Sequence, residues 1–271
     1  MEYFKAEESL VKHGYVILNF SNTENLYKIQ KIINSVFPIT PTYLQNKNIK
    51  DDEYLFYVKT AKDKIVASGL VKGILLENID FFTRLLGPDI DFQSNLHLRV
   101  SRPYIEQDFI DWHRDTFNGN TFWEINIWFP VFPLEKGAGL NIIKNSHILP
   151  SQNIQYVNEK NEFRSKITKG SVASTLGYLY AIKTDDVISQ LNPDQEELLT
   201  PQLGQFILFF GYLAHRAQNF SSLTRISVDL RLKSMFAPTN TKHDYYQPLT
   251  RGAVATYIQK ITKINEYVGD S

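Results

Sequence analysis

The stretch TFWEINIWFPVF, Thr121 to Phe132, is rich in aromatic and β-branched residues, a composition that predicts a β-strand. From residue 94 onward the apolar pattern changes from a helical period to alternation, and turn-rich segments separate the alternating runs. Further strand candidates are LHLRVSRP (96–103), LNIIKN (140–145), QFILFF (205–210) and RISVDLRLKSM (225–235). This half of the chain therefore predicts a β-sandwich or barrel.

Helices are expected before and after these strands. Residues 4–12 predict a short amphipathic helix, YVILNF (15–20) a strand, and the apolar spacing up to Pro38 a second helix that begins after a capping-box pattern at 21–24. Further helices are expected at 78–86 and at 250–268. The polar region 39–60 predicts a loop with some irregular structure.

One domain is expected to cover residues 1–271, because no Pro/Gly/Ser-rich linker or repeat interrupts the chain. It would comprise an N-terminal helical and strand region (1–93), a β core (94–235) and the closing C-terminal helix (250–268). Residues 151–200 are an insertion in the core, rich in Asn, Gln, Lys and Tyr. We expect this insertion to fold over the mouth of the site as a lid.

Composition excludes several classes of protein. The chain has 29 Lys and Arg against 29 Asp and Glu, so no overall charge would attract nucleic acid or an acidic membrane surface. No apolar run approaches 18 residues and the N-terminus lacks a signal-peptide pattern, which favours a cytoplasmic location. The chain contains no cysteine, so His, Asp and Glu remain as possible metal ligands.

The segment DWHRDTFNGN (111–120) allows two interpretations. His113, Arg114, Asp115 and Asn120 match the catalytic loop of protein kinases letter for letter, but the chain lacks the Gly-rich loop, the strand lysine and the Asp-Phe-Gly motif that a kinase needs. The other interpretation is a metal site. Residues i and i+2 of a strand point to the same side, so a strand could present both His113 and Asp115 to one metal ion.

Two later features support the metal interpretation. His215 follows an apolar strand and is the natural third ligand of a 2-His-1-carboxylate Fe(II) site, which leaves open positions for chemistry. Arg225 lies ten residues beyond it, and Ser227 shares its strand face. A guanidinium beside a hydroxyl is suited to binding a small carboxylate.

With these features the sequence resembles the Fe(II)- and 2-oxoglutarate-dependent oxygenases, and within them the phytanoyl-CoA dioxygenase-like group. The resemblance covers residues 95–235 and rests on His113-Arg-Asp115 and on the segments WFPVFPLEKGAGLNIIKNSH (128–147), GQFILFFGYLAHRAQN (204–219) and RISVDLR (225–231). It implies a double-stranded β-helix (a cupin-like jelly roll) with flanking α-helices, which agrees with the predicted strands.

The resemblance also implies roles for single residues. His113, Asp115 and His215 would bind Fe(II), and Arg225 with Ser227 would bind 2-oxoglutarate, the cosubstrate used together with O2. Trp128 would border the cosubstrate, and Asn126 shares its strand face. Because Asp115 is present, hydroxylation or another outcome of hydrogen abstraction is favoured over halogenation, for which related enzymes carry a small residue at this position. One departure is Lys144-Asn145-Ser146-His147 in place of the common P-G-S-H turn, where His147 is expected to bind backbone.

The substrate is less clearly indicated. Arg99 and Arg102 could hold an anionic part of it, although surface salt bridges explain these arginines equally well, and Tyr178 lies in the insertion. The polar insertion favours hydroxylation of an unactivated C–H bond in a small polar metabolite, such as a sugar, an amino acid or a natural-product intermediate, with no nucleic-acid or membrane partner. The alternative is a non-catalytic jelly-roll binding protein or a cupin-type isomerase, neither of which needs Arg225.

Overall fold

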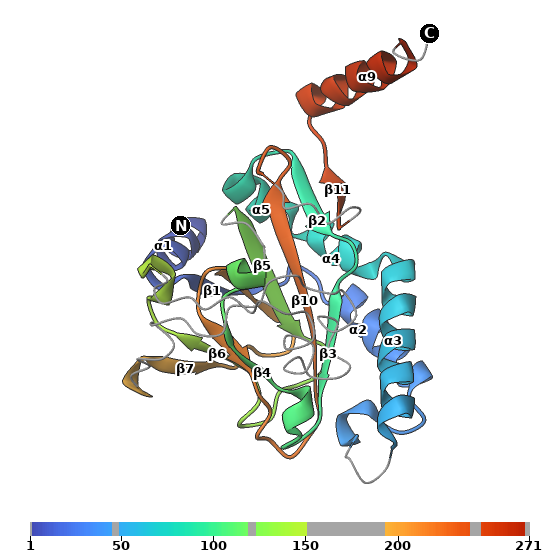
Figure 1. The fold of residues 1–271 in the computed structure, drawn as a ribbon, viewed down its shortest axis with the longest axis vertical. Coiled ribbons are helices and arrows are strands. Elements are labelled where there is room, and N and C mark those ends of the chain that lie inside the picture. The colour runs from blue at the N-terminus through green and yellow to red at the C-terminus, as the bar shows by residue number, and fades with distance from the viewer. Residues whose placement is uncertain (1, 45–48, 119–122, 151–192, 239–244, 269–271) are drawn as a thin grey trace, which may run out of the picture.

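The structure is a computed structural model that describes residues 2–44, 49–118, 123–150, 193–238 and 245–268. Its strands form two antiparallel sheets (Figure 1). The major sheet has seven strands in the order β1-β8-β5-β10-β2-β11, with β3 also paired to β10, and the minor sheet has the order β4-β9-β6-β7. This arrangement confirms the expected mainly β fold with flanking helices.

The strands of the major sheet are β1 (Tyr15–Asn19), β2 (Ile90–Gln93), β3 (His97–Ser101), β5 (Glu124–Pro130), β8 (Gln205–Phe210), β10 (Arg225–Ser234) and β11 (Tyr246–Thr250). Those of the minor sheet are β4 (Ile110–His113), β6 (Leu140–Ile143), β7 (Glu196–Leu199) and β9 (His215–Ala217). The helices are α1 (Glu2–His13), α2 (Glu24–Val36), α3 (Asp51–Ser68), α4 (Leu70–Glu77), α5 (Ile79–Leu86) and α9 (Ala253–Val268).

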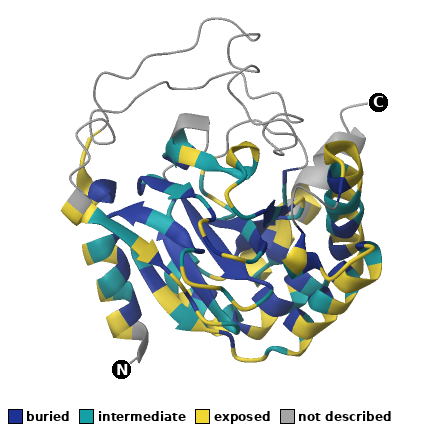
Figure 2. Ribbon diagram, turned by 90° about the horizontal axis from the view of Figure 1, so that it is seen from below, coloured by how far each residue is buried: buried dark blue, intermediate teal, exposed yellow. Residues whose placement is uncertain are grey.

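Strand β10 shows how the sequence separates the two faces of the major sheet. Its even-numbered residues from 226 to 232 are apolar, almost fully buried, and belong to the core that the helices share with the sheet. The odd-numbered residues from 225 to 233 are polar or charged and point to the opposite face. This inner face meets the minor sheet across a second apolar cluster that includes Trp128, Ile142, Ile207 and Phe209. Figure 2 shows the buried strands at the centre and exposed residues on the outer helices.

The predicted loop at 39–60 is wrong in its second half, because α3 begins at Asp51. Only Tyr54, Ala61 and Ile65 are buried along this helix, so its apolar pattern is too sparse to stand out in the sequence. Three acidic residues at 51–53 occupy its first turn, where their negative charges stabilise the helix by interacting with the positive end of its dipole. The C-terminal helix is confirmed as α9.

The major sheet extends beyond the predicted core of 94–235. Strands β1, β2 and β11 lie outside this range and yet pair with β8, β10 and β2 respectively. The predicted lid falls mostly on residues 151–192, which lie outside the described part of the chain, and Tyr178 lies there too. Among the helices that the structure describes, none has both the length and the apolar character needed to cross a membrane.

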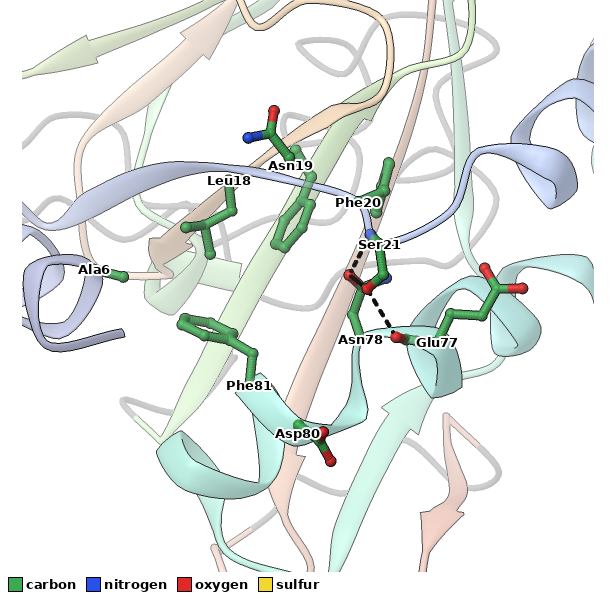
Figure 3. Close-up of a pocket in the computed structure, with 10 residues that line it drawn as sticks. Ala6, Leu18, Asn19, Phe20, Ser21, Glu77, Asn78, Asp80 and Phe81 are labelled. Atoms are coloured by element: carbon green, nitrogen blue, oxygen red, sulfur yellow. Dashed lines mark hydrogen bonds between the residues drawn. The ribbon is translucent and has the colours of Figure 1, made fainter. Parts of the chain in front are cut away.

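The capping box expected at 21–24 does not form. Ser21 instead turns its hydroxyl towards α4, where it donates to the Glu77 carbonyl (2.9 Å) and contacts Asn78 Oδ1 (2.8 Å), while Asn22 accepts from the Glu24 amide. Ser21, Glu77 and Asn78 line a pocket between β1 and the helices (Figure 3). Phe206 also lines this pocket and lies on the helix-covered face of the sheet, so the pocket is on the opposite face from the residues considered next.

Candidate active site

Three predicted ligands come together between the two sheets. His113 ends β4 and His215 begins β9, and these two residues are partners in the antiparallel pairing of the minor sheet. Asp115 does not lie on the strand as predicted, since it is the first residue of a 3-10 helix, Asp115–Asn118. Its backbone amide donates to the Gly211 carbonyl (2.7 Å), which holds this turn against the β8–β9 connection. The side chains therefore converge through a turn rather than through strand alternation.

The geometry of this cluster suits a metal ion. One ligand atom from each of His113, Asp115 and His215 can be chosen so that all lie within 4.8 Å of one another. Asp115 Oδ1 is 3.4 Å from His113 Nε2 and 3.8 Å from His215 Nε2. The two imidazole centroids are 4.2 Å apart. His113 remains partly exposed while the other two ligands are buried, so one side of the cluster is open.

Backbone contacts fix which nitrogen each histidine presents. His113 Nδ1 lies 2.8 Å from the Asp111 carbonyl, and His215 Nδ1 lies 2.8 Å from the Leu213 carbonyl. A carbonyl can only accept, so each Nδ1 carries the proton and each Nε2 offers its lone pair to the centre. Backbone carbonyls commonly orient metal-binding histidines in this way.

Charges around the cluster favour the forms that bind a metal. Burial raises the pKa of Asp115, but the charge of Arg231 outweighs this effect and holds that pKa well below the usual range. Burial lowers the pKa of His215 to about 3, and the neighbouring His113 adds to this effect. Metal ligands must be a carboxylate and neutral imidazoles, so both shifts prepare the site for binding.

Arg231 was missed in the sequence. Its Nη2 donates to Asp115 Oδ2 at 2.6 Å, and its Nε donates to the same oxygen at 3.1 Å. The signal that could have found it is the alternation of β10, because residue 231 shares the inner face with Arg225 and Ser227. The sequence alone would therefore have allowed the prediction that Arg231 points towards the metal ligands.

Arg225 and Ser227 lie on the same inner face, as expected. Arg225 is buried, its Nη1 donates to the Gly139 carbonyl (2.6 Å), and its Nε has no hydrogen-bond partner. Ser227 is fully buried and its hydroxyl is also without a partner. Burial lowers the pKa of Arg225 to about 10, and the charge of Arg99 adds to this effect. Among the described residues, no carboxylate forms an ion pair with Arg225.

Trp128 and Asn126 lie two residues apart on the inner face of β5. The Trp128 ring centroid is 5.8 Å from the Arg225 guanidinium carbon. Asn126 Nδ2 donates to Asp115 Oδ2 at 2.6 Å, so Asn126 lies at the metal end of the site. Residues i and i+2 of a strand are separated by about 7 Å. Asn126 and Trp128 therefore connect the metal end of the inner face with the end at which Arg225 lies.

The two arginines expected to bind substrate lie in different places. Arg99 points to the inner face, opposite Ser227 in the pairing of β3 with β10, and its Nη2 is 3.5 Å from Asp229 Oδ2. Arg102 lies one residue beyond the end of β3, three positions after Arg99, and its side chain points away from the inner face. Its guanidinium binds both oxygens of Asp108 (2.8 and 2.9 Å) and stacks over Tyr54. We therefore assign Arg102 to the packing of α3 rather than to substrate binding.

The turn that departs from the P-G-S-H pattern keeps a left-handed residue. Asn145 occupies the glycine position with φ 60°, a conformation that Asn adopts more readily than most residues. Ser146 Oγ accepts from the Ala214 amide (2.8 Å), directly before the His215 ligand. His147 Nε2 lies 2.9 Å from the Val11 carbonyl, which confirms the expected structural role of His147.

A buried histidine near the cluster, His97, is expected to make the stability of the folded protein sensitive to acid. His97 is 1% exposed; burial and the charges of Arg99 and Arg231 hold its pKa well below the ordinary value of 6.5. Below pH 6.5 only the unfolded chain binds this proton, so stability should fall by up to about 1.4 kcal/mol per pH unit from this group. We expect His97→Gln to lose less stability than the wild type between pH 7.5 and 5.5 in urea unfolding. His215 titrates in both proteins, so equal losses would show that His97 does not contribute.

Comparisons with known proteins support the fold. No family model matches the sequence, and no curated protein matches it either. Among solved structures, apo ThoJ, a non-heme monooxygenase, matches with a TM-score of 0.57 and 12% identity over 92% of this chain and 84% of its own. EvdO2 from Micromonospora carbonacea var. aurantiaca, complexed with 2-oxoglutarate, matches with a TM-score of 0.58 and 13% identity over 88% of this chain and 92% of its own.

SnoN, a non-heme alpha ketoglutarate dependent epimerase from nogalamycin biosynthesis, matches with a TM-score of 0.53 and 10% identity over 92% of this chain and 99% of its own. At these identities the likeness concerns the fold. The chain therefore shares a jelly-roll fold with these three proteins, and it has a His-Asp-His cluster between its two sheets.

Proposed function

We propose that this protein is an Fe(II)- and 2-oxoglutarate-dependent oxygenase that hydroxylates a C–H bond of a small polar metabolite. The observation that carries the proposal is a buried arginine, Arg225, that has no carboxylate partner in the described part of the chain and lies on the inner face of the major sheet, towards the His-Asp-His cluster. A buried cation with an unsatisfied donor beside an unsatisfied hydroxyl, that of Ser227, is costly unless a ligand completes it. A carboxylate would satisfy both groups.

The residues that would bind ligands form two groups, one at each end of the site. His113, Asp115 and His215 would hold Fe(II), which activates O2 with electrons from 2-oxoglutarate when both are bound. Arg225 and Ser227 would bind the carboxylate of 2-oxoglutarate that faces away from the metal. Trp128 would border the bound 2-oxoglutarate, and Ile207 and Phe209, which belong to the same apolar cluster, would exclude water from it. The chain thus supplies binding, orientation and exclusion of solvent.

The partly exposed side of His113 is where a substrate can approach the cluster. Arg99 is a candidate for holding an anionic group of that substrate, because its Nε is buried without a partner. We favour a natural-product intermediate as the substrate, since SnoN, which has a similar fold, is an enzyme from nogalamycin biosynthesis. The partner is then a small molecule rather than nucleic acid or membrane.

The proposal is tested by adding Fe(II) and 2-oxoglutarate to the metal-free protein without oxygen. A weak visible charge-transfer band should develop only when both are present, because it arises from the chelate of the keto acid with the metal. Fe(II) with succinate, which lacks the keto group, is the control and should give no band. Absence of the band with 2-oxoglutarate would contradict the proposal and favour a binding protein.

A second measurement separates hydroxylation from other outcomes of the same site. Candidate metabolites are added with O2, and both succinate and the mass of the product are measured. Hydroxylation adds one oxygen atom to the product, whereas epimerisation, the reaction named for SnoN, leaves the mass unchanged. If the product has an unchanged mass and succinate is formed with it, the proposed cofactors would be supported and hydroxylation would be contradicted.

A further inference from the structure

The two carboxylate oxygens of Asp115 have different surroundings. Oδ1 faces the two histidines, at 3.4 Å from His113 Nε2 and 3.8 Å from His215 Nε2. Oδ2 faces away and accepts three hydrogen bonds, two from Arg231 (2.6 and 3.1 Å) and one from the Asn126 amide (2.6 Å). One oxygen is therefore directed at the cluster while the other is already saturated.

The groups that saturate Oδ2 are themselves held in place. Arg231 and Asn126 are directly opposite each other in the pairing of β10 with β5, and both are buried. Arg231 Nη1 donates to Gln93 Oε1 (3.0 Å) and contacts the Tyr245 hydroxyl (3.4 Å). Because these partners come from β2 and from residues before β11, the orientation of the guanidinium is fixed from several directions. Rotation of the Asp115 carboxylate would break its strongest contacts.

We propose that Arg231 and Asn126 are positioning residues that restrict Asp115 to binding a metal through Oδ1 alone. The inference rests on the proposed metal site and deepens it. A carboxylate that binds a six-coordinate metal through both oxygens occupies two positions and leaves two beside the histidines. A carboxylate that binds through one oxygen leaves three, which is the number needed for 2-oxoglutarate and O2 together.

A purely structural ion pair is the competing explanation, and the same strand offers a matched control for it. Lys233 lies two residues beyond Arg231 on the same face, is also buried, and binds Asp91 (3.2 Å), a carboxylate outside the cluster. Lys233→Met therefore removes a buried cation from β10 without changing the contacts of Asp115. Arg231→Met removes the donors to Oδ2 and keeps an unbranched side chain.

The test measures how Asp115 binds Zn(II), by the infrared difference between the zinc-loaded and the metal-free protein. The separation of the two carboxylate stretching bands is wide for binding through one oxygen and narrow for binding through both, and an Asp115→Asn variant identifies the bands. We expect a wide separation in the wild type and in Lys233→Met, and a narrow one in Arg231→Met. In Arg231→Met, 2-oxoglutarate should also bind the zinc-loaded protein at least about tenfold more weakly, as for other partners of metal ligands.

Each result decides the inference. A wide separation and unchanged 2-oxoglutarate affinity in Arg231→Met would overturn it and leave the metal site standing. Failure of the wild type to bind Zn(II) would overturn the proposed metal site and this inference with it. If Arg231→Met does not fold, Asn126→Ala removes one of the three donors, and it should narrow the band separation by a smaller amount. No change in Asn126→Ala would then count against the inference.

Discussion

Asp115→Ala is expected to abolish 2-oxoglutarate-dependent oxidation and to create a binding position for an added anion. Without the carboxylate, only His113 and His215 remain as protein ligands, so a further position opens beside the reacting centre. The loss of negative charge makes an anion such as chloride or azide favourable there. Anion-dependent changes in the visible band of the Fe(II) and 2-oxoglutarate complex would measure its binding. Oxidation at the wild-type rate without added anion would show that Asp115 is not a ligand.

Asp115→Ala is also expected to lower the stability of the folded protein, because Asp115 is a buried ion-pair partner as well as a proposed ligand. It is buried and forms an ion pair with Arg231 at 2.6 Å, which is shorter than the 4.0 Å pair of Arg231 with Asp229. Leaving one member of a buried ion pair without the other costs about 3–5 kcal/mol. Formate, which resembles the missing carboxylate, should recover part of this loss and raise the melting temperature of the variant.

A double variant separates the charge effect from the loss of packing. Asp115→Ala with Arg231→Met has no buried cation at this position, so formate should no longer raise its melting temperature. Equal stabilisation of the single and the double variants by formate would show that the anion acts elsewhere. This cycle also measures the coupling between the two side chains, which single substitutions cannot do.

How far the sequence could predict this fold depended on how continuous the apolar pattern of each element is. The long strands β5 and β8 were found because they are runs rich in apolar, aromatic and β-branched residues, and β10 was found because apolar and polar residues alternate along it. Strands β2, β7 and β9 have only three or four residues and were missed. Their pairing partners are distant in the chain, so the tertiary contacts that define them leave no local pattern.

The candidate site shows a similar division. The three ligands were predicted by residue type and spacing, and they do converge, although the reason given for Asp115 was wrong. A turn held by the Gly211 carbonyl brings Asp115 into place, and no alternation pattern encodes such a contact. Arg102 was named as a possible substrate residue with a salt bridge as the equal alternative, and the structure shows the salt bridge, to Asp108. Arg231 was overlooked, although its alternation with Arg225 was visible in the sequence.

Arg225→Lys is expected to weaken 2-oxoglutarate binding far more than metal binding. The guanidinium uses Nη1 to bind the Gly139 carbonyl and keeps Nε, next to the unpartnered Ser227 hydroxyl, for a ligand. A lysine has one charged nitrogen and cannot bind the carbonyl and two carboxylate oxygens in the same geometry. Burial and Arg99, which already lower the pKa of Arg225 to about 10, would also favour the neutral form of a lysine at this position.

We therefore expect the dissociation constant of 2-oxoglutarate for the metal-loaded Arg225→Lys protein to rise about 100-fold, in line with the cost of disrupting a buried charged pair. Zn(II) affinity should change by less than about threefold, because Arg225 contacts none of the three ligands. Arg102→Lys is the matched control, since it changes a buried arginine that is hydrogen-bonded to Asp108 and Asp51 and that we place outside the site, and it should leave 2-oxoglutarate affinity unchanged. Equal loss of zinc and 2-oxoglutarate in Arg225→Lys would mean that the substitution disrupts the inner face as a whole, and would remove Arg225 from its proposed role.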